Sequence, residues 1–181
     1  MALSMDQLPL RLHHNAYVTR DQKATRHFYE DLIGMPLIAT WAEHADLFGK
    51  VRVYCHTFYG MADGGALAFF QFATEEDQEF FGPQMPSSAF HHIAMKCEQS
   101  AQNAIKARLE DSDHDPGKRY FIDHGYCESL YVEDPNGLLL EFTVDANDVE
   151  KIDAARRADA HQVLDRWLAG DHSPNNLEHH D

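Results

Sequence analysis

The residues best suited to chemistry are two pairs of adjacent histidines and one isolated carboxylate. His13-His14 returns 78 positions later as His91-His92, and the second pair is followed by Glu141 inside the apolar run GLLLEF. Two imidazoles and one carboxylate can hold a divalent metal while leaving coordination positions open, as in non-haem Fe(II) oxygenases. The sequence therefore predicts a mononuclear metal site.

Glu141 is the most informative member of this set. An ionised carboxylate in an apolar strand costs on the order of several kcal/mol unless it is paired or coordinated. The alternatives are a solvent-facing position on an edge strand, or an ion pair with an arginine such as Arg119. We interpret Glu141 as a metal ligand.

One histidine of each pair can be chosen from strand geometry, because neighbouring side chains on a strand face opposite sides. The sequence predicts that His14 and His92 share the inward faces of their strands with apolar neighbours. These neighbours are Leu12, Ala16 and Val18 for His14, and Phe90 and Ala94 for His92. His14, His92 and Glu141 are thus the predicted ligands.

The repeat extends beyond the histidines, since residues 54–70 align without a gap on residues 126–142. Such a period indicates two similar modules, placed here at residues 8–74 and 86–146. The alignment puts Phe69 opposite Glu141, which leaves three protein ligands. A slip of two residues would bring Gln71 there instead and give four ligands, so the choice between Phe69 and Gln71 separates two kinds of enzyme.

Each module is predicted to contain one strand, one helix and three more strands. In the first module these are a strand through residues 11–19, a helix over Lys23–Ile33 capped by Asp21, and strands Leu37–Trp41, Val51–Tyr59 and Ala66–Phe72. In the second they are strand Phe90–Cys97, helix Ser100–Leu109, and strands Arg119–Ile122, Ser129–Val132 and Leu138–Val144.

The segments outside the modules have different predicted roles. Thr74–Ser88 is polar and carries two prolines, so it is interpreted as a linker. Residues 147–170 show apolar positions at helical spacing and predict an amphipathic helix that packs on the domain or on a second subunit. Residues 171–181 are expected to form a flexible tail.

Composition narrows the partners and the location. The net charge of −15 disfavours a nucleic-acid partner, because such binding relies on Lys and Arg. No apolar span of membrane length and no signal-peptide pattern is visible, so we expect a cytoplasmic protein without a membrane partner. Three cysteines without CxxC spacing are expected to be reduced thiols.

Over roughly residues 10–145 the chain resembles the vicinal oxygen chelate superfamily. This superfamily includes glyoxalase I, extradiol ring-cleavage dioxygenases, methylmalonyl-CoA epimerase, and fosfomycin and bleomycin resistance proteins. The stretches HNAYVTRD and HHIAM carry the resemblance. It implies an α+β fold in which two tandem βαβββ modules within residues 1–146 form a curved mixed sheet around a metal held by His14, His92 and Glu141.

The stretch IDHGYCESLYVEDPNGLLLE resembles the signature of type I extradiol dioxygenases. The resemblance implies that His124 and Tyr131 are catalytic and bind a substrate oxygen or an intermediate beside the metal. One feature departs from the pattern. The segment ATEEDQEFFGPQ lacks the additional histidine that these enzymes usually supply, and Asp77 or Gln78 occupies the nearest place.

Three functions follow as hypotheses. The leading one is an Fe(II) extradiol-type dioxygenase that cleaves a catechol-like aromatic diol with O2. The second is a redox-neutral enzyme of the glyoxalase or epimerase type, with Gln71 as a fourth ligand. Fe(II) is the expected metal of the site, and Mn, Zn, Ni or Co are the alternatives. The third is a metal-free module that binds a drug or metabolite. A homodimer is expected, with the helix at residues 147–170 offering an apolar face to a twofold partner.

Overall fold

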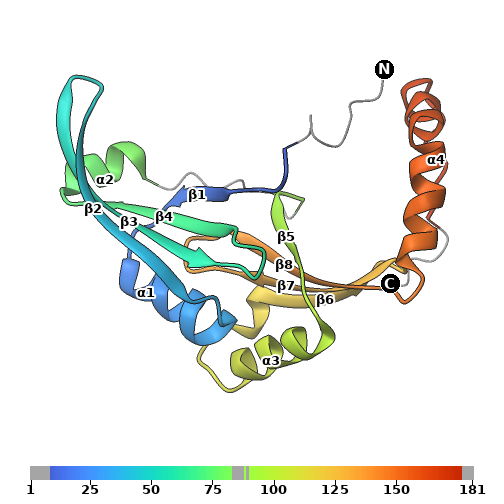
Figure 1. Cartoon of the computed structure of the whole chain (residues 1–181), viewed down its shortest axis with the longest axis horizontal. Helices are drawn as coiled ribbons and strands as arrows, with labels where there is room; N and C mark the ends of the chain where they lie inside the picture. Colours follow the sequence, from blue (N-terminus) through green and yellow to red (C-terminus); the bar gives the residue numbers. More distant parts are fainter. Residues whose placement is uncertain (1–8, 83–87, 89, 177–181) are drawn as a thin grey trace. The chain divides into compact units, whose positions relative to one another are not determined.

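The computed structural model describes residues 9–82, 88 and 90–176, and these residues form two compact units. The first unit contains the described residues before Ser88 together with Asp134–Leu138, and the second contains the rest. Each unit is built on a four-stranded mixed sheet with helices (Figure 1). The predicted α+β class, with a C-terminal helix, is confirmed.

The first unit has the sheet order β1-β4-β3-β2, with β1 parallel to β4 and the other pairs antiparallel. Its elements are β1 (His14–Val18), α1 (Gln22–Arg26), the π-helical turn η2 (His27–Ile33), β2 (Leu37–Leu47), β3 (Lys50–Gly60), β4 (Ala66–Phe72) and α2 (Glu75–Phe81).

The second unit repeats this arrangement with the order β5-β8-β7-β6, in which β5 runs parallel to β8. Its elements are β5 (His92–Lys96), α3 (Gln99–Glu110), the short 3₁₀ turn η3 (Pro116–Lys118), β6 (Arg119–Asp123), β7 (Cys127–Glu133), β8 (Leu139–Asp145) and α4 (Val149–Leu168). The predicted order of one strand, one helix and three strands is confirmed in both units.

The first helix forms where the sequence predicts it. The Asp21 side chain accepts hydrogen bonds from the backbone N–H groups of Lys23 and Ala24, which satisfies two donors that a helix start leaves unpaired. Gly34 ends the helix with a φ of 90°, a conformation that glycine adopts without steric cost. Between these signals the apolar side of the helix turns toward the sheet.

The core of the first unit lies between this helix and one face of its sheet. Tyr29 is fully buried, and its ring packs on Tyr59 and Phe69 at centroid separations of 5.2 and 4.8 Å. The Tyr29 hydroxyl donates to Oδ2 of Asp134 at 3.0 Å, and Asp134 Oδ1 accepts from the backbone N–H of Leu138 at 2.8 Å. The turn that contains Asp134 therefore has a structural role.

The second unit buries the corresponding face under α3. Ile105 and Leu109 of this helix are buried, and Gln102 Nε2 donates to the carbonyl oxygens of Phe142 at 2.8 Å and Glu128 at 3.0 Å. An amide that bonds two neighbouring strands holds the helix in register with the sheet. Helix α3 does not cover the opposite face of this sheet, which carries His92 and Glu141.

Two predictions about segments need correction. The segment interpreted as a linker contains α2, because Thr74 caps that helix by accepting from the Asp77 N–H; residues 83–87 lie outside the described part. Strand β2 continues six residues past the predicted end and forms a long hairpin with β3. Helix α4 forms as predicted and none of its residues is buried, so its packing on the domain or on a second subunit stays a prediction.

Among the described residues, no helix is both long enough and apolar enough to cross a membrane.

Asp77 links α2 to the hairpin. The residue is 2% exposed, and its Oδ1 accepts from Arg52 Nε at 2.9 Å and from Lys50 Nζ at 3.1 Å. Burial by itself raises the pKa of this carboxyl, but the hydrogen bonds from Thr74, Lys50 and Arg52 outweigh it and bring the pKa below the ordinary 3.8. The ionised form therefore stabilises this corner of the unit.

Asp77→Asn is expected to lower the free energy of unfolding at neutral pH. A lowered folded-state pKa gives stability that is present above the unfolded-state pKa and lost as the pH falls through the folded-state pKa. The difference from wild type should therefore shrink as the pH is lowered from about 5 toward 3. Urea titrations followed by circular dichroism measure it, and a constant difference over this range would assign the effect to packing.

Candidate metal centre

Strand register brings Glu141 to the middle of one face of the second sheet. On β8 it lies opposite Ala94 of the parallel strand β5 and opposite Tyr131 of the antiparallel strand β7. His92 lies two residues before Ala94 and so shares this face. Its Nε2 is 2.8 Å from Glu141 Oε2. Two of the three predicted ligands therefore meet within this unit.

The environment of Glu141 matches what a bound cation needs. The residue is 5% exposed, and its polar neighbours include His92 Nε2 at 2.8 Å, His124 Nε2 at 3.9 Å and the Tyr131 hydroxyl. A buried carboxylate requires compensation for lost hydration. An oxygen donor and a nitrogen donor at contact distance are the atoms that a divalent first-row metal prefers. The donor chemistry thus fits a metal ion.

Tyr131 and His124, the predicted catalytic pair, lie beside Glu141. The Tyr131 hydroxyl is 3.0 Å from His124 Nε2, and the Tyr131 ring stacks on Tyr120 at 4.7 Å. Burial, followed by the hydrogen bond and charge of Glu141, raises the pKa of Tyr131 well above its ordinary value. The phenol is therefore neutral near pH 7 and remains a proton donor.

The third predicted ligand, His14, belongs to the first unit, at the start of β1. Its side chain shares a face with His56 and Phe58, whose rings lie 6.5 and 5.6 Å from it between centroids. Its Nδ1 is 2.8 Å from Nδ1 of His13. Within each unit, and over the residues that the structure describes, no three His, Cys, Asp or Glu side chains form a group that could hold a metal. The set of three stays a prediction.

The faces differ from the sequence prediction in one respect. His14 and Ala16 do share a face, as do His92 and Ala94, but these four residues are exposed. Within each unit the helix covers the other face, so the histidines lie on the side that their own helix leaves open. The predicted alternation is confirmed, and the face that the histidines share is the one that the helix of each unit leaves uncovered.

Neither Phe69 nor Gln71 lies on the face that carries His14. Phe69 is fully buried against Tyr29, on the helix side of the sheet. Gln71 lies two residues on, and its amide accepts from the Gln22 N–H and donates to the Arg20 carbonyl oxygen, both at 3.1 Å. These bonds tie β4 to the start of α1.

The residue that corresponds to Glu141 in the first unit is Ala68. His14 pairs with Ala66 on β4, just as His92 pairs with Leu139 on β8, so counting two residues on gives Ala68 and Glu141. The ungapped alignment is thus shifted by one residue along β4. An alanine there cannot bind a metal, and this agrees with a set of three protein ligands.

Asp77 and Gln78, which occupy the place of a missing histidine, have structural partners. Asp77 pairs with Arg52, as described above. Gln78 accepts from the Phe72 N–H at 2.8 Å and donates to the Thr19 carbonyl oxygen at 2.9 Å. Neither side chain is available for the acid-base role that the resemblance assigns to that position.

His56 is the residue that sequence reasoning passed over. Its ring stacks on Phe70 at 3.6 Å and lies 4.2 Å from Phe58, and burial lowers its pKa. Its Nε2 is buried and has no hydrogen-bond partner among the described residues. The alternation of faces along β3 places His56 on one face with Phe58, and the pairing of β3 with β4 adds Phe70 to that face. This alternation is the sequence signal that could have identified His56.

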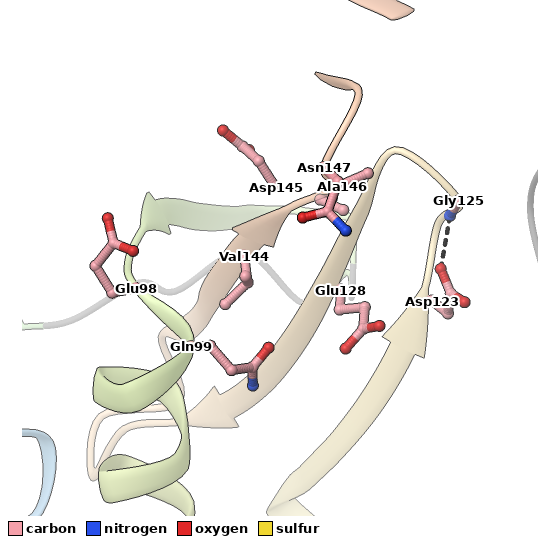
Figure 2. Close-up of a pocket in the computed structure, with 10 residues that line it drawn as sticks. Glu98, Gln99, Asp123, Gly125, Glu128, Val144, Asp145, Ala146 and Asn147 are labelled. Atoms are coloured by element: carbon pink, nitrogen blue, oxygen red, sulfur yellow. Dashed lines mark hydrogen bonds between the residues drawn. The ribbon is translucent and has the colours of Figure 1, made fainter. Parts of the chain in front are cut away.

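A cavity of the second unit lies where β7 begins and β8 ends, and it does not include the candidate ligands. This cavity of about 510 Å³ is lined by residues at the starts of α3 and β7 and at the ends of β6 and β8 (Figure 2). Four carboxylates border it: Glu98, Asp123, Glu128 and Asp145. Its lining is acidic and contains no histidine, in contrast to the face around Glu141.

The fold and the face around Glu141 define a protein of the vicinal oxygen chelate kind. The family model described as the Glyoxalase/Bleomycin resistance protein/Dioxygenase superfamily matches residues 11–142. The chain belongs to this superfamily. A search of curated proteins found no match.

Solved structures show the same fold at low sequence identity. The fosfomycin resistance protein FosX from Listeria monocytogenes is 13% identical, with a TM-score of 0.54 over 78% of this chain and 98% of its own. FosX from Mesorhizobium loti is 16% identical, with a TM-score of 0.53 over 80% and 98%. A glyoxalase/dioxygenase from Nostoc punctiforme is 21% identical, with a TM-score of 0.51 over 81% and 98%.

Gln71→Ala is expected to leave metal affinity within about twofold of wild type while lowering stability. The amide contributes two hydrogen bonds to the start of α1, each worth about 1 kcal/mol, so the free energy of unfolding should fall by roughly 1–2 kcal/mol. Isothermal titration with Co²⁺ and urea unfolding measure the two effects. A large loss of affinity with unchanged stability would instead make Gln71 a ligand.

Proposed function

We propose that this protein is a mononuclear Fe(II) dioxygenase of the extradiol type, acting in the cytoplasm on a catechol-like aromatic diol. The observation that carries the proposal is the grouping of His92, Glu141, His124 and Tyr131 on one open sheet face, with Glu141 buried. The proposed ligands are His92 and Glu141 together with His14 of the first unit. Mn, Zn, Ni and Co remain alternative metals.

A bound Fe(II) ion supplies Lewis acidity toward two vicinal substrate oxygens and one-electron chemistry toward O2. In the balanced reaction both atoms of O2 enter the product, and a ring carbon–carbon bond beside the diol breaks without an external reductant. His14, His92 and Glu141 would hold the ion, and a set of three protein ligands would leave coordination positions for these groups. The protein then has to manage protons and orientation.

His124 and Tyr131 are placed to manage those protons. A catechol must lose protons to bind a metal through both oxygens, and His124 Nε2, 3.9 Å from Glu141 Oε1, would accept one of them. The Tyr131 hydroxyl, held neutral by its raised pKa, donates a hydrogen bond to an oxygen on which negative charge develops. Because the two groups are 3.0 Å apart, a proton can pass between them.

The competing functions have weaker support. A glyoxalase-type site with four protein ligands would need Gln71, whose amide is engaged on the opposite face. A metal-free binding module has no need for a buried carboxylate beside an imidazole. A FosX variant from Listeria monocytogenes was solved with Mn(II) and 1S,2S-dihydroxypropylphosphonic acid, so Mn(II) belongs in any panel of metals.

Anaerobically purified protein loaded with Fe(II) is expected to consume O2 and catechol in equal amounts. An oxygen electrode records the uptake over a panel of substituted catechols, and the absorbance of the ring-opened product confirms cleavage. Tightly bound zinc or nickel, with no O2 uptake across the panel, would refute the proposal.

Glu141→Gln is the matched control for this assay, because it keeps the shape of the side chain and removes its charge. Loss of a ligand should weaken Fe(II) binding by more than the 10- to 100-fold that is typical of outer-shell changes. Uptake of O2 should fall with metal content. Full activity of this variant would remove Glu141 from the site.

We further propose a homodimer that forms through α4. Leu164, Trp167 and Leu168 are 54%, 56% and 73% exposed on a helix with no buried residue, and helices gain most of their stability from packing. A second copy related by a twofold axis would cover these apolar side chains.

Leu164→Glu combined with Trp167→Glu is expected to convert a dimer into a monomer, as measured by light scattering after size exclusion. Ala158→Glu adds a charge on another side of the same helix, outside the proposed interface, and should leave the dimer intact. A monomeric wild type, or a dimer that survives the double substitution, would contradict this interface.

A further inference from the structure

We infer that His13 is a positioning residue that holds the imidazole of His14 in the tautomer a metal requires. The inference rests on the proposed function, since it takes His14 as a metal ligand. The observation is the contact between the two Nδ1 atoms at 2.8 Å, a hydrogen-bond distance between neighbouring residues. His13, the member of the pair that is not a proposed ligand, thus has a positioning role.

The contact joins the Nδ1 atoms of the two histidines, so one of these atoms carries the proton and donates it while the other accepts. If His14 donates from Nδ1 to Nδ1 of His13, then Nε2 of His14 carries a lone pair and can bind a metal. If His13 donates instead, neutral His14 is protonated at Nε2 and cannot bind through that atom. Metal-binding histidines usually donate their other N–H to a neighbouring acceptor, which fixes both tautomer and ring orientation.

His14 is exposed, with aromatic rings on one side of it. Phe58 meets it edge to face at 5.6 Å, and His56 lies at 6.5 Å on the same face of the sheet. The Phe58 ring has no group that can accept the proton of an imidazole N–H. The His13 Nδ1 lies at hydrogen-bond distance and can do so.

The second unit shows a different arrangement at the equivalent pair. His92 contacts Glu141 through Nε2, while His91 has only its backbone N–H bonded, to the Ser88 carbonyl oxygen. Over the described residues, the His91 ring makes no hydrogen bond or ring contact. The two histidine pairs therefore look alike in sequence and differ in structure, and His91 provides a matched control for His13.

The first test needs no metal. Long-range proton–nitrogen NMR correlations identify the tautomer of each ring, recorded on metal-free protein above the ordinary histidine pKa of about 6.5. We expect His14 to be protonated at Nδ1 in wild type, and to revert in His13→Ala to the mixed tautomers of an unconstrained imidazole. A wild-type His14 protonated at Nε2, or a tautomer unchanged in His13→Ala, would overturn the inference.

The second test measures affinity for Co²⁺ alone by isothermal titration. His13→Ala is expected to weaken binding about 10- to 100-fold, as loss of an outer-shell partner does. His13→Asn keeps an acceptor oxygen near the position of Nδ1 and should restore most of the affinity. His91→Ala should bind like wild type, and the urea midpoints of all variants should agree.

The outcomes separate this inference from the proposed function. If His14→Ala binds Co²⁺ as tightly as wild type, His14 is not a ligand, and both the ligand set and the positioning role fail. If His14→Ala loses affinity while His13→Ala and His91→Ala both bind like wild type, the ligand set stands and the role of His13 is refuted. A loss in His13→Ala that Asn does not rescue would also count against it.

Discussion

A carboxylate buried between apolar neighbours on β8 is the constraint on which the candidate site depends. Glu141 lies between Leu140 and Phe142, whose side chains belong to the helix-covered face, so its own side chain must take the other face. There it meets His92 and lies near His124, whose nitrogens compensate in part for the hydration it has lost. The position of Glu141 on β8 therefore fixes the face on which its carboxylate lies.

The two units share one topology but carry different side chains on the face that the helix leaves uncovered. Both place the opening histidine of a parallel strand beside the closing strand, and both cover the opposite face with a helix. In the first unit the position of Glu141 is taken by Ala68, and aromatic rings fill the face around His14. The second unit thus has a carboxylate beside its histidine, while the first unit has a histidine among aromatic rings.

Much of the architecture was predictable because its signals are local. The Asp21 cap, the Gly34 stop and the period-two strands each act within a few residues, and every predicted strand and helix exists. Errors arose where distant partners decide the outcome. Strand β2 continues beyond its apolar start because β3 supplies backbone partners along its length, and α2 is held in the supposed linker by Thr74 and an ion pair to Arg52.

The sequence alone determined the superfamily, the α+β class and the residue types of the proposed site, because histidine pairs, repeat length and the lone glutamate are written in the order of the chain. Tertiary structure decided which residues share a face. A slip of one residue along a strand reverses every side chain, so only the pairing of β1 with β4 could exclude Phe69 and Gln71 from the face of His14. The contact between His13 and His14 is likewise invisible in sequence, since it depends on the directions of two rings.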